Sequence, residues 1–492
     1  MCYNFTVVGG VVVFSLDDKK FLNIDVNRLL FLISVALFVI LSISNLSHHI
    51  PWADEVNAWN IAGNVSFLDL FKLAKYEGHM FVWFTILMPF AKHNLFFPNS
   101  LLAINWIFMF LSVLVLWRFA PFNSLTKTFL TFSFPIMMYS YLARCYSIGV
   151  LLFFCIAALY PKRLKHPLWY SLLIILVANT SVMALMGAFA LGLIFLLDLY
   201  QNRNTLKKNA IIGSISIFAL GATLILTQLL NFQTPYYAFT NSWNSYRTFL
   251  SFMLGRNSID LTHVPLVISY SILLISSCIA FRKDIKIPVF LFITQFSLLI
   301  IFSKIYSAEI WHFAFIFIYL ILAVWIYFSE HKPETNFQKC YKIIFLLFVL
   351  SLAFYKTNYI TYNSDCIDFR NYVIENIQEY QNAKIFVYPD FNYVNTIYPY
   401  LTKYNIKIYN SHADAFGSFD FFAHQWDDED IDFIAIKKVL AEDEFGYILV
   451  RKRFNDKLLE NIKQNAKEAG LKAIPYYCVL PIYIYKVEKI KN

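Results

Sequence analysis

The sequence is poor in charged residues and lacks several motifs that mark soluble enzymes. Only 15% of its 492 residues are charged, whereas 59% are hydrophobic and 19% are aromatic. A soluble core of this length does not require so many apolar side chains, so the composition excludes an ordinary soluble globular protein. The sequence also contains no Gly-rich phosphate-binding loop, no paired-cysteine metal motif and no internal repeat. It therefore gives no support to a nucleotide-binding loop or a cysteine-ligated metal site.

Long apolar runs predict a polytopic α-helical membrane protein. The first run, residues 29–46, has about the 20-residue length at which a helix crosses a bilayer core. Lys19, Lys20 and Arg28 precede it and no small-residue cleavage site follows, so we interpret it as a retained span. Ten further runs bring the expected total to about 11 transmembrane helices: 99–117, 129–143, 145–160, 168–179, 182–197, 209–229, 264–281, 287–303, 311–328 and 341–355.

The positions of Lys and Arg predict the orientation of these spans. The basic segment 162–165 lies between two long apolar stretches, 129–160 and 168–197, each of which we interpret as a hairpin of two short spans. Because loops rich in Lys and Arg stay in the cytoplasm, the N-terminus is expected inside and residues 357–492 outside. The net charge of +9 then belongs mainly to cytoplasmic loops, and a nucleic-acid partner is not expected.

The last part of the chain differs from the rest. Residues 357–492 alternate strand-like and helix-like segments, which predicts a small extracytoplasmic α/β domain after a membrane domain of residues 1–356. Its acidic run 427–432 lacks the spaced pattern of a calcium loop, so we interpret it as a solvated loop. The spacing of Cys366 and Cys478 allows a disulfide but does not require one.

The first outer loop, residues 47–98, is too long and too aromatic for a simple connection. Its apolar spacing predicts helices that lie on the membrane surface. The segment 80–91 is apolar but too short to span comfortably, so it is expected to dip into the interface. The loop also carries the adjacent carboxylates Asp54 and Glu55 just past the first span, which predicts chemistry at the membrane surface.

These features resemble the GT-C glycosyltransferases, integral membrane enzymes that take a sugar from a polyprenyl-phosphate carrier. The resemblance rests on the pair Asp54-Glu55, on Glu77-Gly78-His79 in the same loop, and on Arg144-Cys145-Tyr146 at an outer helix end. In layout it covers the whole membrane region. The sequence looks most similar to the branch that contains the protein mannosyltransferases and the aminoarabinose transferases of lipid A.

Two positions depart from the pattern of this family. Relatives usually have a proline after the histidine or lysine of the first loop, and here Met80 occupies that place. Thr180-Ser181 stands where many relatives carry Thr-His. The resemblance therefore assigns no substrate contact at these two positions.

The required chemistry points to Asp54 as a general base. An acceptor hydroxyl or amine must lose its proton as it attacks the anomeric carbon, and a carboxylate within reach accelerates this step by roughly 10²- to 10⁴-fold. Adjacent residues on a helix point about 100° apart, so only one acid of the pair is expected to face the site. We expect Glu55 to orient Asp54 or the acceptor. The simpler alternative is that both acids only cap an interfacial helix.

The leaving lipid phosphate gains negative charge, so cationic groups at the outer face should stabilise it. Arg144 is the best placed, with interfacial snorkelling as the alternative. His79 can donate to the phosphate or contact the sugar, and Glu77 can bind sugar hydroxyls or pair with Lys75. The other candidate substrate-binding residues are Tyr146, from the motif, and the outer-loop cations Arg247, Arg256 and Lys304.

The sequence therefore predicts an inverting glycosyltransferase that works on the extracytoplasmic face, in the lipid of a bacterial inner membrane. It would move a sugar from a polyprenyl-phosphate donor to a lipid, glycan or protein acceptor. No metal is expected to be required, although a divalent ion held by His48, His49 and the acids of the loop is left open. The alternatives are a transporter or flippase and a polysaccharide polymerase or ligase. A transporter is disfavoured because most charges lie at the ends of the spans.

Overall fold

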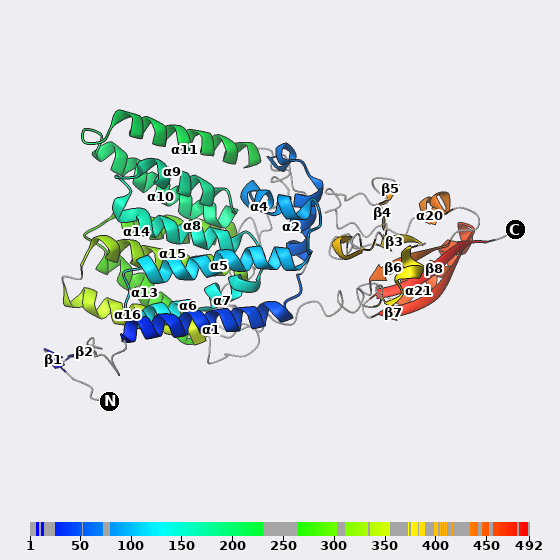
Figure 1. The fold of residues 1–492 in the computed structure, drawn as a ribbon, viewed down its shortest axis with the longest axis horizontal. Helices are drawn as coiled ribbons and strands as arrows, with labels where there is room; N and C mark the ends of the chain where they lie inside the picture. Colours follow the sequence, from blue (N-terminus) through cyan, green and yellow to red (C-terminus); the bar gives the residue numbers. More distant parts are fainter. Residues whose placement is uncertain are drawn as a thin grey trace.

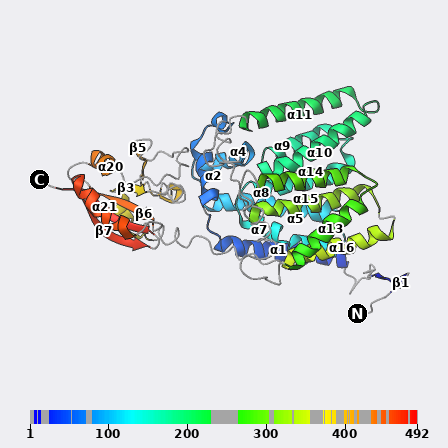
Figure 2. The same ribbon diagram turned by 180° about the vertical axis from the view of Figure 1, so that it is seen from behind.

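The computed structural model consists of a helical bundle followed by an α/β domain (Figure 1). The structure describes residues 25–51, 53–71, 79–229, 264–302, 310–332 and 335–354 of the bundle, two short N-terminal strands, and interrupted segments between 372 and 490. The strands β1 (Thr6–Val8) and β2 (Val11–Val13) form an antiparallel pair. Figures 1 and 2 show this pair beyond one end of the bundle and the α/β domain beyond the other.

Six of the described helices are long and apolar enough to cross a membrane, so the chain is an integral membrane protein. They are α1 (Val26–His48), α5 (Asn99–Phe119), α10 (Val182–Gln201), α11 (Lys208–Leu229), α15 (Ile310–Glu330) and α16 (Asn336–Phe354). Shorter apolar helices lie between them: α8 (Tyr146–Leu159), α9 (Pro167–Ala178), α13 (Val264–Ala280) and α14 (Lys286–Ile300). The expected count of about 11 spans is not confirmed by these lengths.

The run 129–143, expected to be one span, is divided between two helices. They are α6 (Ser124–Thr131) and α7 (Phe134–Tyr141). Pro135 lies in the first turn of α7, where proline is well tolerated, and it has no amide hydrogen with which to continue a helix that began earlier. The hydrophobic pattern does not reveal this break, because every residue around it is apolar or small.

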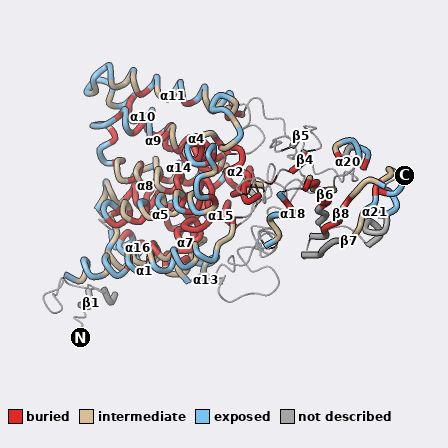
Figure 3. Tube along the Cα trace, turned by 45° about the vertical axis from the view of Figure 1, so that its right-hand side comes forward, coloured by how far each residue is buried: buried red, intermediate tan, exposed pale blue. Residues whose placement is uncertain are grey.

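Helix α15 forms the centre of the bundle, and its whole span is buried among the other helices. Figure 3 shows exposed residues instead along α1 and α11, whose apolar side chains face outward as expected for lipid contact. Gly187 of α10 allows Tyr319 of α15 to approach closely. The Tyr319 hydroxyl donates to the Met183 carbonyl at 2.5 Å and accepts from the Gly187 amide at 3.1 Å.

The first outer loop contains α2 (Ala53–Asn64) and α4 (Phe81–Ala91), which lie at the end of the bundle nearest the α/β domain (Figure 1). Helix α4 has 11 residues, about 17 Å of helix, and is too short to cross the bilayer. Helix α2 differs from the expected surface helix, because residues 55–62 are all buried. It packs beneath α4 and the following loop, which its own sequence could not reveal.

The opposite end of the bundle is held by a buried network of charges. Asp198 of α10 accepts from Arg163 Nε at 2.6 Å and from Lys286 Nζ at 2.5 Å. Arg163 also pairs with Glu330 at the end of α15 and stacks over the Tyr160 ring, with 3.8 Å between Cζ and the ring centroid. These contacts join the ends of α10, α14 and α15 to the segment after α8.

The C-terminal part forms a six-stranded sheet with the strand order β5-β4-β3-β6-β8-β7. Strand β3 is parallel to both β4 and β6, and the other pairs are antiparallel. This confirms the α/β organisation expected from the sequence. The strands are β3 (Lys384–Tyr388), β4 (Ile408–Asn410), β5 (Ala415–Phe416), β6 (Phe445–Arg451), β7 (Leu471–Val479) and β8 (Ile482–Lys489).

Helices cover both faces of this sheet. On one face, α18 (Ile377–Gln381) and Leu401 pack against Ile385. On the other, α20 (Phe433–Val439) and α21 (Asp456–Glu468) pack against Phe386. The acidic run 427–432 and Cys366 lie outside the described residues, so the predictions made for them stay open.

Candidate active site

The adjacent acids Asp54 and Glu55 lie in the first turn of α2, where the positive end of the helix dipole favours carboxylates. Their surroundings differ completely. The Asp54 side chain is 44% exposed, whereas Glu55 is fully buried. Because adjacent residues on a helix point about 100° apart, the two carboxylates meet different partners. Only Asp54 is open to a substrate.

Asp54 forms an ion pair with Arg144, which lies at the break between α7 and α8. Arg144 Nη1 donates to Asp54 Oδ2 at 2.6 Å, and the guanidinium is almost completely buried. The guanidinium carbon lies 5.4 Å from the ring centroid of Tyr146, the first residue of α8. Arg144 Nη2 also contacts Nε2 of His79. The structure thus brings together Asp54, His79, Arg144 and Tyr146, four of the residues predicted from sequence.

His79 is buried beneath this cluster, and its protonation follows from its neighbours. Burial lowers the pKa of His79 well below its ordinary value, and the nearby Arg144 charge lowers that pKa further. The imidazole is therefore neutral near pH 7. A guanidinium can only donate hydrogen bonds, so Nε2 must accept from Arg144 and the proton resides on Nδ1. His79 Nδ1 lies 3.4 Å from the Cys145 sulfur. The buried Cys145 sulfur accepts the hydrogen bond that fixes the tautomer of this histidine.

Glu55 connects three parts of the site. Its carboxylate accepts from the backbone amide of Ala143 at 2.5 Å and pairs with His49 Nε2 at 2.9 Å. Ala143 directly precedes Arg144, so this contact fixes the backbone that carries the guanidinium. His49, one of the histidines considered for a metal, follows the end of α1 and lies 5.5 Å from the Tyr141 ring.

His312 is a further neighbour of the site, and no sequence motif marks it. It lies in the first turn of α15 and is fully buried. Its ring is perpendicular to that of Tyr146, with 5.8 Å between the centroids. A lone histidine at the start of a long apolar run was the only available signal, and that pattern is more often structural than functional.

The segment at His79 is anchored by the turn between α9 and α10. The Met80 amide donates to the Thr180 carbonyl at 3.3 Å, and Val82 donates to the Asn179 carbonyl at 3.2 Å. Ser181 caps α10 by accepting from the Ala184 amide at 3.1 Å. The Thr-Ser pair that departs from the family pattern therefore has a structural task here.

The remaining candidate residues lie outside the part of the chain that the structure describes, and their roles stay predictions. They are Glu77, Arg247, Arg256 and Lys304. Among the described residues, no group of three or more His, Cys, Asp or Glu side chains is arranged to hold a metal ion. Since Glu77 is not among them, the question of a divalent metal stays open.

No family model matches the chain, and no curated protein matches its sequence. Two crystal structures of ArnT from Cupriavidus metallidurans match its fold. The structure bound to undecaprenyl phosphate has a TM-score of 0.52 at 9% identity, and the apo structure has a TM-score of 0.53 at 10% identity. Each alignment covers 92% of this chain and 97% of ArnT.

The chain has the fold of ArnT. This confirms the GT-C-like fold that the motifs of the first loop predicted. The ArnT-like alignment extends through the membrane helices into the C-terminal part, since it covers nearly the whole of both chains. At such low identity the likeness to ArnT concerns the fold alone, so the chemistry has to be argued from this chain's own residues.

Proposed function

We propose that the chain is an inverting glycosyltransferase that moves a sugar from a polyprenyl-phosphate donor to an envelope lipid, glycan or protein acceptor. One observation carries the proposal. An exposed carboxylate, Asp54, is fixed by a buried guanidinium, Arg144, which also contacts the neutral imidazole of His79. The fold that holds these groups is shared with ArnT, a protein whose crystal structure contains undecaprenyl phosphate.

In this proposal Asp54 is the general base. The acceptor oxygen attacks the anomeric carbon and forms the new glycosidic bond while its proton passes to the Asp54 carboxylate. The bond from the anomeric carbon to the phosphate oxygen breaks in the same step, and polyprenyl phosphate leaves with the bonding electrons. A single displacement of this kind inverts the configuration. The exposure of Asp54 supports the role, because the acceptor must reach the carboxylate.

Arg144 is proposed to stabilise the departing phosphate. A guanidinium carries a permanent positive charge and a planar fork of N–H donors, which suits it to the oxygens of a departing phosphate. Its burial increases the effect, since a fixed charge acts more strongly where water is excluded. His79 accepts a hydrogen bond from Arg144, so we assign it the task of orienting the guanidinium instead of donating to the phosphate.

Glu55 is proposed to position Arg144 and to take no direct part in proton transfer. An acceptor cannot reach a fully buried carboxylate. Its bond to the Ala143 amide and its pair with His49 fix the backbone next to Arg144. A substitution at Glu55 should therefore act through the placement of the guanidinium.

The proposed location is the extracytoplasmic face of a bacterial inner membrane. Helix α10 begins beside His79 and carries Asp198 about 24 Å further along, so the network of Arg163 and Lys286 lies at the other end of the bundle. Arg163 belongs to a basic segment of the kind that stays in the cytoplasm. This supports a location of Asp54 and the α/β domain together on the outer side.

A transporter is less well supported by the described residues. The ion pairs of the bundle, Asp54 with Arg144 and Arg163 with Asp198, lie near its two ends. A transport pathway requires ionisable groups along the span, near the middle of the membrane. We therefore retain the transferase as the single proposed function.

The test uses the full chain in lipid with labelled polyprenyl-phosphate sugars and envelope extracts as acceptors. Wild type should transfer label and release one polyprenyl phosphate for each sugar. Asp54→Asn should lower transfer by roughly 10²- to 10⁴-fold. Asp69→Asn is the matched control, because Asp69 is another acid of the same loop, and its carboxylate accepts from the hydroxyl of the nearby Ser66 at 2.6 Å.

Two results would contradict this proposal. Equal transfer by wild type and Asp54→Asn would show that Asp54 is not the base. No transfer from any polyprenyl-phosphate sugar by folded wild type would reject the proposed reaction, and diphosphate-linked glycans would then be the next donors to supply.

A further inference from the structure

The loop between α4 and α5 connects the acid-bearing helix α2 with the C-terminal part of the chain. Asn94 of this loop accepts a hydrogen bond from Trp59 Nε1 at 3.1 Å. Its own Nδ2 donates to the carbonyl of Pro399 at 3.0 Å. Trp59 is buried and lies one turn after Glu55, on the same face of α2. One side chain therefore bonds both the helix of the active site and a residue 305 positions away.

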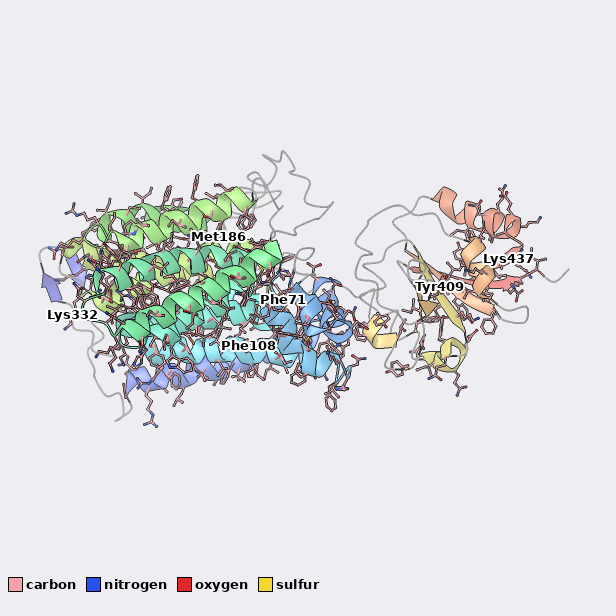
Figure 4. The ribbon with its side chains drawn as sticks, turned by 90° about the horizontal axis from the view of Figure 1, so that it is seen from above. Phe71, Phe108, Met186, Lys332, Tyr409 and Lys437 are labelled. Atoms are coloured by element: carbon pink, nitrogen blue, oxygen red, sulfur yellow. The ribbon has the colours of Figure 1, made fainter. Side chains whose placement is uncertain are left out.

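Aromatic rings make the same connection beside these hydrogen bonds. The Phe97 ring packs against Trp59, with 5.2 Å between centroids, and against Tyr400, with 4.9 Å between centroids. Tyr400 is buried with the core of the bundle, although it belongs to the C-terminal part of the chain. Figure 4 shows a short yellow turn at this position, against the blue helices at the end of the bundle.

The backbone of the loop shows that its conformation depends on these contacts. Asn94 has φ = 45° and Phe96 has φ = 52°, both in the left-handed region. Asparagine adopts this region with some ease, whereas a bulky residue such as Phe96 rarely does. Such conformations persist only where the surroundings hold them. The loop therefore depends on Trp59 on one side and on residues 399–400 on the other.

The direction of the sheet explains why residues 399–400 reach this loop. They follow β3, whose neighbours β4 and β6 run parallel to it, so the carboxyl ends of all three strands share one edge. Strand β8 runs antiparallel to β6 and leads to the C-terminus, which lies far from the bundle (Figure 1). The shared carboxyl edge consequently faces the bundle, and the chain that leaves β3 meets the loop there.

We propose that Asn94 is a positioning residue that transmits the docking of the C-terminal domain to helix α2 and so to Asp54. The domain is then a part of the catalytic apparatus, because its contact with the loop sets the helix that carries the base. Only the effect on catalysis rests on the proposed function; the mechanical coupling between domain and helix does not.

The test is hydrogen–deuterium exchange of the full chain in lipid, read on peptides of α2. Asn94→Asp keeps an oxygen that accepts from Trp59 but places a carboxylate against the Pro399 carbonyl, so it breaks only the link to the domain. Tyr400→Leu weakens the same link from the domain side. Each should raise exchange in α2 about fivefold, the effect of losing one ordinary hydrogen bond. Trp59→Phe should have the same effect.

Asn202→Asp is the matched control. Asn202 Nδ2 donates to a backbone carbonyl, that of Asp198, at 2.9 Å, but it lies at the other end of the bundle. This variant should leave exchange in α2 unchanged. Exchange in peptides of β6 and β8 shows whether Tyr400→Leu has unfolded the domain. Asn94→Asp tests the coupling without a substitution in the domain.

The kinetic measurement separates positioning from a merely structural role. Asn94→Asp should lower kcat several-fold and leave KM for the donor nearly unchanged, because α2 sets Asp54 and, through Glu55, the Arg144 guanidinium, and both act chiefly in the transition state. If α2 exchanged at the wild-type rate in both Asn94→Asp and Tyr400→Leu, the coupling would be overturned. Raised exchange with unchanged kcat would overturn the positioning role. If wild type transfers no sugar, the proposed function fails, and the exchange experiment still decides the coupling.

Discussion

Arg144 Nη1 donates to Asp54 Oδ2 at 2.6 Å across 90 residues of sequence. The pair joins the first turn of α2 to the break before α8, and its two members differ sharply in exposure. A buried cation beside an exposed carboxylate suits a reaction in which a phosphate leaves as a proton is taken up. The ion pair therefore defines where the base and the leaving group would meet.

Arg144→Lys should reduce transfer by about 10²-fold or more, although the charge is kept. Lysine cannot reproduce the planar fork that holds Asp54 and contacts His79, and removing one oriented donor to a developing oxyanion costs roughly 10²- to 10³-fold. Initial rates over a range of donor concentrations give the measurement. Arg118→Lys, at the last turn of α5, is the control and should transfer at the wild-type rate. Full activity of Arg144→Lys would remove Arg144 from the phosphate site.

Glu55→Gln should be milder than Asp54→Asn, with a loss of about tenfold in kcat. Glutamine keeps an oxygen that can accept from the Ala143 amide, but it loses the carboxylate charge that strengthens the hydrogen bond with His49. A positioning role predicts this graded loss, since one charge-assisted bond contributes about 1.5–3 kcal/mol and the Ala143 bond remains. Parallel assays of the two variants decide the question. An equal or larger loss in Glu55→Gln would make Glu55 the better candidate for the base.

His79 should make the stability of the protein depend on pH. This residue lies in the outer loop, and burial holds its pKa well below the value near 6.5 expected in the unfolded chain. Below about pH 6.5 the unfolded chain binds a proton that the folded protein does not, so stability falls as the pH falls. The contribution reaches at most about 1.4 kcal/mol per pH unit.

The measurement is the apparent Tm between pH 7.5 and pH 5.5, with detergent and heating rate held constant. His79→Gln can still accept from Arg144 but has no titrating group, so its Tm should fall less steeply with decreasing pH than that of wild type. The exposed His166 provides the control, and His166→Gln should follow the wild-type slope. Identical slopes for His79→Gln and wild type would show that His79 is protonated in the folded protein.

Local patterns in the sequence were enough to predict a helical membrane protein, the α/β part and the cluster of Asp54, His79 and Arg144, but not the number of spans. Apolar runs and a short motif are local signals. The pairing of Glu55 with His49 and Ala143, and the link from Trp59 through Asn94 to Pro399, are not, because they depend on how distant segments pack. Helix α2 was misjudged as a surface helix for the same reason. Its partners lie elsewhere in the chain.

Asp198→Asn should destabilise the protein without affecting the site. Asp198 is buried and accepts from both Arg163 and Lys286, so the amide would leave two cations short of their shared counter-ion. Removing one partner from a buried ion pair costs roughly 3–5 kcal/mol, because the remaining charge stays desolvated. Glu330 still pairs with Arg163 and should keep the loss toward the lower end of this range.

The expected result for Asp198→Asn is a Tm several degrees below that of wild type, with donor KM and kcat unchanged at a temperature where the variant is folded. Asp284→Asn is the matched control, since Asp284 lies just before α14 and accepts from the Lys286 backbone amide at 3.2 Å. Its smaller effect should separate the loss of the buried ion pairs from the loss of one ordinary hydrogen bond near the same helix end. If Asp198→Asn had the same Tm as wild type, the network would add nothing to stability. If its kcat fell while its Tm did not, the two ends of α10 would be coupled.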